Sequence, residues 1–151
     1  MDSVVLQALL MDKISIGDVF RLPLTPEDGI IPKNSGDAYR NKMFVVLGKD
    51  NEENLIGAVV INSTINQNLS NEIKMLQYPI TSMKYDFLTH NSHIDCADLK
   101  EIQMHRFANT RGRNGYIGKL ELDDLEYVIG AVKESPIVTP KTLRRFGIDK
   151  L

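Results

Sequence analysis

The sequence has a single cysteine, no tryptophan and no marked excess of charge of either sign. One cysteine, Cys96, cannot form an internal disulfide, and such sparing use of cysteine is typical of proteins in a reducing compartment. The 18 basic and 20 acidic residues give a net charge of -2, which excludes long-range attraction of the whole chain to nucleic acid or to an anionic membrane. Any site for a polyanion must therefore be local.

Zinc-binding spacing is missing as well. Cys96 and the three histidines, His90, His93 and His105, do not form any of the paired spacings that hold a zinc ion in proteins. We therefore expect neither a metal nor another cofactor.

The chain also lacks a long hydrophobic run. The apolar residues 4–11 are too few to span a bilayer, and they follow Asp2 rather than a basic segment, so they do not form a secretory signal. They predict a short amphipathic helix capped by Asp2 or Ser3. We accordingly expect a cytoplasmic protein without a membrane partner.

Length and hydrophobic content favour one domain. A chain of 151 residues with 42% hydrophobic residues can bury a real core, and it shows no repeat and no linker. The predicted domain covers residues 1–151, with a core over 16–134, an N-terminal helical extension over 1–15 and a short C-terminal helix within 136–151.

Strand patterns fill the middle of the chain. Residues 17–24 alternate between apolar and polar, and the apolar runs 43–47 and 55–61, joined by an acidic turn, predict a central hairpin buried on both faces. Residues 78–80 and 85–88 are weaker strand candidates, and Asn114-Gly115 predicts a hairpin turn before a strand at 116–120. The polar stretch 25–41 predicts a long binding loop or a disordered segment.

The alternation of residues 91–102 breaks in its middle. Ile94 and Cys96 share one face, whereas Ala97 and Leu99 share the other, so the phase slips between Cys96 and Ala97. Such a slip predicts a bulge or a strand end, a feature that often re-aims side chains beside a functional site.

Helices are predicted near the C-terminus. Residues 124–133 carry one apolar stripe, with Asp123 and Glu126 at capping-box spacing, and Thr139-Pro140 and Gly147 bracket a last short helix. The expected order is a helix, about six strands, a helix and a short helix. Because the strands are not separated by helices, we predict a mainly β fold with α-helices, either a small, strongly bent β-barrel or a highly curved sheet.

Two basic residues stand where the long loop meets the first apolar strand. The guanidinium of Arg40 could hold two phosphate oxygens and stabilise charge in a phosphoryl-transfer transition state, or it could pair with Asp37 or Glu27. Lys42 could be a second phosphate contact or a solvated lysine at a strand edge.

The second apolar strand ends in Asn62, Ser63 and Thr64, whose polar groups could contact a phosphate or relay a proton, or simply form a turn. If this strand pairs with the first one, these side chains emerge near Arg40.

Charged residues also surround the phase slip and a later turn. His93 and Asp95 share one strand face, which suits a histidine–carboxylate general base and equally suits a solvated face. Asp98 and Lys100 are either a placed charged pair or a sign that the sheet has ended. Arg111 and Arg113 flank a glycine turn and are the last candidates for contacts to an RNA backbone. Alternatively, they are solvated arginines at the tip of a loop.

The order of these parts resembles the PemK/MazF/Kid family of toxin endoribonucleases over residues 16–134. The matching segments are the opening strand Gly17-Asp18-Val19-Phe20, the loop arginine and strand at 36–47, the strand and polar end at 59–66, the charged strand from Ser92 to Arg106, and Gly118-Lys119-Leu120 before a helix.

The resemblance implies a small, strongly bent barrel of the Src-homology-three type with a C-terminal helix, commonly a homodimer. It also implies metal-independent cleavage of single-stranded RNA, in which the ribose 2′-hydroxyl attacks the adjacent phosphate. The implied roles are a phosphate clamp for Arg40, acid or base for Asp98 or Asp95, and a donor hydroxyl for Ser63 or Thr64. An antitoxin with a disordered tail is the implied protein partner.

The chain departs from the family pattern in two places. An ungapped match puts Ala97 at the position of the family's acidic residue, and Asn41 replaces the proline after the loop arginine. The alternative hypothesis is therefore a catalytically altered relative that acts as an RNA- or protein-binding module.

Overall fold

The computed structural model describes residues 13–24, 40–104, 106 and 115–151. The predicted N-terminal helix, the loop 25–39, and Arg111 and Arg113 lie outside these residues. The described elements, in chain order, are β1 (Asp18–Leu24), β2 (Arg40–Asp50), β3 (Leu55–Asn62), α2 (Asn71–Lys74), β4 (Gln77–Ile80), β5 (Ser92–Asp95), β6 (Lys100–Gln103), β7 (Tyr116–Lys119), α5 (Leu122–Glu134), α6 (Pro140–Arg145) and the 3₁₀ helix η2 (Ile148–Lys150).

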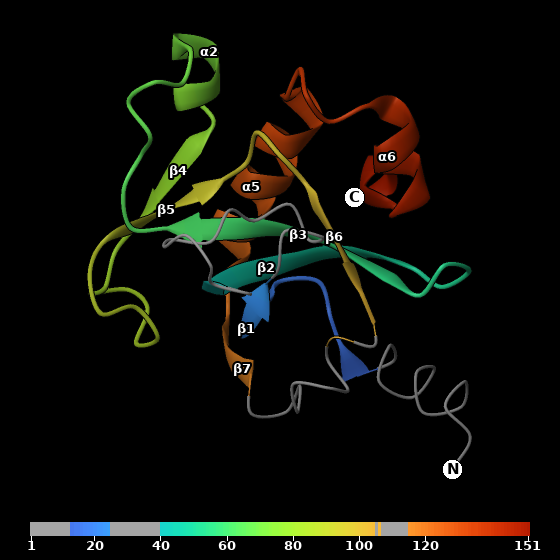
Figure 1. The fold of residues 1–151 in the computed structure, drawn as a ribbon, viewed down its shortest axis with the longest axis horizontal. Helices are drawn as coiled ribbons and strands as arrows, with labels where there is room; N and C mark the ends of the chain where they lie inside the picture. The colour runs from blue at the N-terminus through green and yellow to red at the C-terminus, as the bar shows by residue number, and fades with distance from the viewer. Residues whose placement is uncertain (1–12, 25–39, 105, 107–114) are drawn as a thin grey trace.

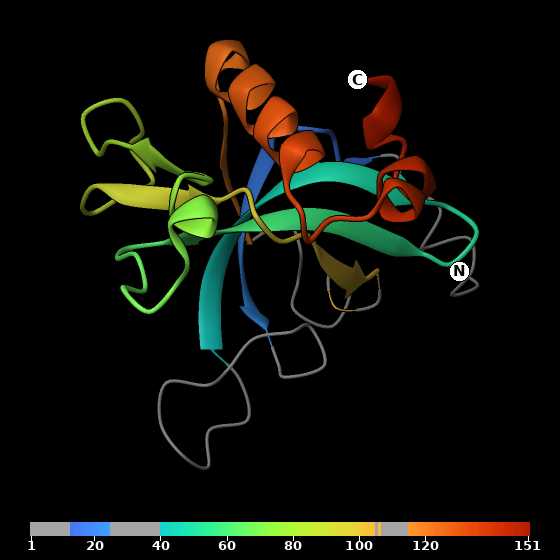
Figure 2. The same cartoon turned by 90° about the horizontal axis from the view of Figure 1, so that it is seen from above.

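The strands form one seven-stranded sheet in the order β4-β5-β3-β2-β1-β7, and β6 also pairs with β3. Every pairing is antiparallel. The sheet is curled into a half-barrel, with α5 lying across one of its faces (Figures 1 and 2). The prediction of a mainly β fold built on a highly curved sheet is confirmed.

The central hairpin of β2 and β3 is buried on both faces, as predicted. Val45 and Val59 belong to the core cluster that includes Val128 of α5, whereas Phe44 and Val60 belong to the cluster on the other face of the sheet. Alternation along each strand divides the apolar run between these two clusters. The hairpin is thus the buried centre of the sheet.

The phase slip in residues 91–102 is the gap between β5 and β6. β5 pairs with the end of β3, through Ile61 and Asn62, whereas β6 pairs with the start of β3. Between them, Asp95 Oδ1 accepts a hydrogen bond of 3.0 Å from the backbone N–H of Ala97, which closes a turn of the type that Asp favours. The predicted strand end is confirmed, and it places two short strands along one edge of β3.

The C-terminal helices agree with their sequence signals in most respects. In α6 the hydroxyl of Thr139 accepts a hydrogen bond of 3.2 Å from Thr142 N, and Gly147 follows with a φ of 72°, as the cap residues predict. The predicted capping box at the start of α5 is wrong, because Glu121 is the N-cap residue and its side chain makes no capping hydrogen bond.

Two other local predictions need correction. Residues 85–88 form turns rather than a strand, since Leu88 N donates a backbone hydrogen bond of 3.1 Å to Tyr85 O. Tyr85 is buried, and its hydroxyl hydrogen-bonds to Asp124 of α5. Arg40 and Asn41 belong to β2 rather than to the preceding loop, since they pair with Leu24 and Pro23 of β1. Among the described residues, no helix has the length and apolar character needed to cross a bilayer.

Candidate functional site

Polar side chains meet at the end of the sheet where β2 begins and β3 ends. Asn62 lies opposite His93 of β5, and Gln77 of β4 lies opposite Asp95. From β2, Lys42 Nζ donates a hydrogen bond of 2.5 Å to Asn62 Oδ1. We call these five residues the polar rim: Lys42, Asn62, Gln77, His93 and Asp95. Strand pairing therefore gathers residues that are up to 53 positions apart in the sequence, from 42 to 95.

A recess of about 330 Å³ opens at this rim, and we call it the Asp95 recess. It brings together five of the residues predicted from sequence, with three neighbours from the loop after β3 and from β4. Its lining consists of Lys42, Asn62, Ser63, Thr64, Asn66, Leu69, Gln77 and Asp95. The recess thus combines a cation, a carboxylate and two hydroxyl groups within one cavity.

The Asp95 carboxylate is held in a fixed position. Its Oδ1 atom accepts hydrogen bonds from Gln77 Nε2 at 2.8 Å and from Ala97 N at 3.0 Å. Within the described part of the chain, Oδ2 makes no hydrogen bond, so this oxygen can accept a proton or a donor group from a ligand. Oδ1 thus binds Gln77 and the turn at Ala97, while Oδ2 keeps its capacity to accept a hydrogen bond.

His93 contains a polar atom without a protein partner. Its Nδ1 is buried and has no hydrogen-bond partner among the described residues. Buried polar atoms in folded proteins are nearly always hydrogen-bonded, so an unpaired one calls for a specific explanation such as a bound group. His93 lies next to Asn62 and two residues before Asp95, at the centre of the polar rim.

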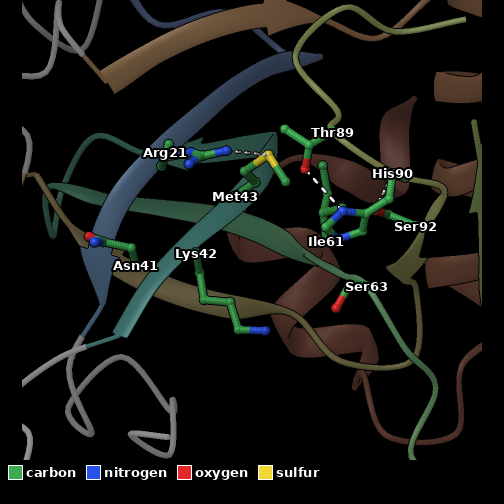
Figure 3. A pocket seen from close by; sticks show the side chains of 9 residues that line it. All are labelled: Arg21, Asn41, Lys42, Met43, Ile61, Ser63, Thr89, His90 and Ser92. Carbon is green, nitrogen blue, oxygen red and sulfur yellow. Dashed lines mark hydrogen bonds between the residues drawn. The ribbon is translucent and has the colours of Figure 1, made fainter. Parts of the chain in front are cut away.

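A second recess has a volume of about 260 Å³, and Figure 3 shows the side chains that line it. It shares Lys42 and Ser63 with the Asp95 recess and is named the Arg21 recess here. Its lining comprises Arg21, Asn41, Lys42, Met43, Ile61, Ser63, Thr89, His90 and Ser92. Met43 and Ile61 of the second recess alternate along β2 and β3 with Lys42 and Asn62 of the first, so the two hollows lie on opposite faces at this end of the sheet and share Lys42 and Ser63.

Asp98 and Lys100 are placed apart from these recesses. They form an ion pair of 2.8 Å, and Lys100 lies opposite Ala58 of β3. Ala58 is four residues from Asn62, which corresponds to about 13 Å along a strand. Neither residue lines the Asp95 recess, so the strand break separates Asp95 from Asp98.

The one cysteine is a core residue. Cys96 is fully buried, and burial raises the pKa of its thiol to about 12, with the nearby charge of Asp95 acting in the same direction. A thiol in this state is a poor nucleophile at neutral pH.

A cluster of three carboxylates at the start of α5 has the spacing of a possible metal site. Oxygen atoms of Glu121, Asp123 and Asp124 lie within 4.8 Å of one another. The ammonium group of Lys84 lies 3.3, 3.1 and 2.9 Å from these three side chains, respectively. A lysine thus already provides the positive charge that a metal ion would supply.

Sequence reasoning missed Gln77, Arg21, Thr89 and His90 as members of the site. The alternation of residues 17–24 did place Arg21 on the face opposite Phe20 and Leu22, which was the available signal. Its proximity to Met43 depends on the pairing of β1 with β2, which no local pattern encodes.

Comparison with known proteins adds no identification. No protein-family model matches the chain, and no curated protein matches its sequence.

Proposed function

We propose that this protein is a PemK/MazF-like toxin that cleaves single-stranded RNA without a metal ion, and that it acts at the polar rim. The observation that carries the proposal is the convergence of Lys42, Ser63, Thr64 and Asp95 in one recess. These residues come from three separate segments, and together they provide the proton acceptor, cation and donors that cleavage by transesterification requires.

In the proposed reaction, the ribose 2′-oxygen attacks the adjacent phosphorus, and the bond from phosphorus to the 5′-oxygen breaks. Asp95 accepts the 2′-hydroxyl proton on Oδ2, and the Lys42 ammonium gives a proton to the departing 5′-oxygen. The hydroxyl groups of Ser63 and Thr64 donate hydrogen bonds to the negatively charged phosphorane, and the family resemblance gives Arg40, the first residue of β2, the role of phosphate clamp. The products are a 2′,3′-cyclic phosphate and a 5′-hydroxyl.

Asp95 is a better candidate than Asp98 for the carboxylate of this reaction. Asp95 lines the recess with Lys42, whereas the carboxylate of Asp98 is engaged by Lys100 on the far side of the strand break. In this assignment the acidic residue stands two positions before Ala97, the buried residue that matches the family's acidic position.

The first experiment incubates the purified protein and single-stranded RNA of mixed sequence in the presence of EDTA. Cleavage to 2′,3′-cyclic phosphate ends is expected, and Lys42→Ala, Arg40→Ala and Asp95→Asn should each reduce the rate by about 100-fold or more. Asp98→Asn, a matched loss of one carboxylate outside the recess, should keep the rate within about threefold of the wild type. RNA that stays intact at high protein concentration would contradict the proposal.

Two partners belong to this proposal. The disordered tail of an antitoxin would cover the polar rim and block RNA, and the active form would be a homodimer. Co-expression with the reading frame next to this gene, followed by light scattering, measures both associations.

A second candidate function is an RNA- or protein-binding module without catalysis. The observation in its favour is Ala97, which occupies the expected acidic position and whose backbone carbonyl accepts a 2.6 Å hydrogen bond from Ser135 Oγ. Binding of RNA without cleavage, unaffected by Asp95→Asn, would support this alternative.

A further inference from the structure

The lining of the Arg21 recess has an unusual charge composition for this chain. It includes two basic side chains, Arg21 and Lys42, together with His90, while the described residues around it contribute no carboxylate. By contrast, Asp95 lines the adjoining recess, and acidic residues of the β2–β3 turn line a third one. A net charge of -2 for the whole chain makes this local excess of positive charge informative.

Arg21 is exposed and has only a weak acceptor nearby. Its Nη2 donates to Met43 Sδ at 3.7 Å, and among the described residues it forms no ion pair (Figure 3). A thioether is a weak acceptor, so the guanidinium keeps donors that can bind a stronger one. The planar fork of an arginine matches two oxygen atoms of a phosphate. Arg21 is thus oriented against the recess wall with its binding capacity largely unused.

The opposite wall of the recess carries hydroxyl groups on an ordered turn. Thr89 Oγ1 lies 3.0 Å from His90 Nδ1, and Ser92 Oγ donates a hydrogen bond of 3.0 Å to the His90 carbonyl. These interactions hold residues 89–92 in place. Hydroxyl groups and an imidazole facing an arginine across a small hollow are a typical set of ligands for a phosphate group.

We propose that the Arg21 recess binds the RNA phosphate adjacent to the one cleaved in the Asp95 recess, with Arg21 as its main contact. The inference rests on the proposed function, because it takes the Asp95 recess as the cleavage site. Lys42 and Ser63 line both hollows, so an RNA strand that passes around the end of the sheet beside Lys42 would place one phosphate in each hollow. Figure 3 shows the amino group of Lys42 directed toward the side where Ser63 lies.

The test measures binding separately from cleavage. A fluorescent single-stranded 2′-O-methyl RNA cannot react, so its anisotropy reports affinity alone. Arg21→Gln should weaken binding by about 5- to 30-fold and reduce the slope of log K against log salt by about 0.7, the value for one phosphate contact on a single strand. Arg21→Lys should restore most of the slope, and Arg144→Gln, an equal loss of charge at an exposed position of α6, should change neither quantity.

A methylphosphonate scan of the same RNA identifies the contact. Neutralising the one phosphate linkage that Arg21 contacts should weaken RNA binding by the wild type and leave RNA binding by Arg21→Gln unchanged. Thermal melting of both variants checks that the fold is retained.

The outcomes separate this inference from the proposed function. If the wild type cleaves RNA while Arg21→Gln binds with unchanged affinity and salt slope, the Arg21 subsite is overturned and the cleavage function stands. If the wild type binds the RNA through Arg21 but never cleaves a reactive RNA, the cleavage function fails and the phosphate site remains. Absence of any RNA binding overturns the subsite.

Discussion

Asp124 is a buried carboxylate whose charge is held by three side chains. Tyr78 donates a hydrogen bond of 2.6 Å, Tyr85 donates another, and Lys84 lies at 2.9 Å. Burial acts to raise the pKa of Asp124, but the hydrogen bonds from the two tyrosines and the lysine outweigh it and lower that pKa. The hydrogen bond to Asp124 raises the pKa of Tyr78 to about 12. Through Tyr78 this network anchors β4, the strand that carries Gln77 into the Asp95 recess.

Replacing this carboxylate should destabilise the fold in a pH-dependent manner. In Asp124→Asn, an amide NH₂ group replaces one carboxylate oxygen and faces a tyrosine hydroxyl that also donates, so one hydrogen bond is lost. We therefore expect a loss of about 2 kcal/mol in the free energy of unfolding at pH 7. Because the folded pKa of Asp124 lies below the unfolded value of about 3.9, its stabilisation is present above pH 3.9 and is lost as the pH falls through the folded pKa. Urea unfolding at pH 7 and at decreasing pH should show that the unfolding free energies of the wild type and the variant converge as the pH falls.

Asp123→Asn is the matched control for this prediction. Asp123 contacts the same lysine, but its side chain is 74% exposed, so the change should cost less than about 0.5 kcal/mol. If the two variants lost the same unfolding free energy, the burial of Asp124 would not determine its contribution to stability.

Among the elements, the split between β5 and β6 determines the composition of the candidate site. The split directs His93 and Asp95 to the polar rim and leaves Asp98 with Lys100 beside the middle of β3. Its turn is held from the other side by Ser135, which follows α5 and donates a hydrogen bond to the Ala97 carbonyl. The helix thus fixes the place where the strand breaks.

The C-terminal segment also depends on a close contact with the central hairpin. A Cβ atom at Gly48 would lie 2.8 Å from Phe146 Cβ, and one at Gly57 would lie 2.9 Å from Phe146 Cγ. Phe146 itself is buried, so the two glycines allow the chain after α6 to pack directly on the strands.

Gly48→Ala should therefore loosen this packing. We expect a loss of about 1 to 3 kcal/mol in unfolding free energy, because the added methyl group forces the backbone of the two segments apart. Hydrogen exchange should rise in residues 140–151 more than in β2.

Gly130→Ala provides the matched change in an open position. Gly130 is exposed in α5, and a Cβ added there would have no atom of the described residues within 4 Å, so we expect a gain of about 0.5 to 1 kcal/mol in unfolding free energy. Tolerance of alanine at position 48 would refute the proposed role of the glycine contact.

For the molecule as a whole, charge is distributed locally rather than globally. The net charge is -2, yet Arg21 and Lys42 line one recess at the end of the sheet where β2 begins with Arg40. Acidic residues concentrate elsewhere, at the β2–β3 turn and at the start of α5. RNA association should consequently depend on a few direct contacts and little on long-range steering.

This distribution predicts a shallow salt dependence. Two to three phosphate contacts on a single strand correspond to a slope of log K against log salt of about -1.4 to -2.1. Anisotropy titrations between low and moderate salt measure this slope. A slope steeper than about -4 would instead indicate an extended basic surface.

Local patterns were enough to predict much of the architecture. The apolar runs around Phe44 and Val59 predicted the central hairpin, and the phase slip at Cys96 and Ala97 predicted the end of β5. The Thr139-Pro140 pair similarly predicted α6. Each of these features depends on residues close together in the chain. The wrong prediction of a strand at 85–88 arose because Tyr85 bonds to Asp124, which is 39 positions away.

The sequence by itself determined the periodicities, the caps of α6 and the strand break, because these depend on backbone preferences and on alternation within short segments. Only the tertiary structure decided that Asp95, and not Asp98, shares a recess with Lys42, and that Arg21 lines a second recess with the same lysine. Those placements depend on the register of β1, β3, β4 and β5, which is set by side chains packing across the whole sheet.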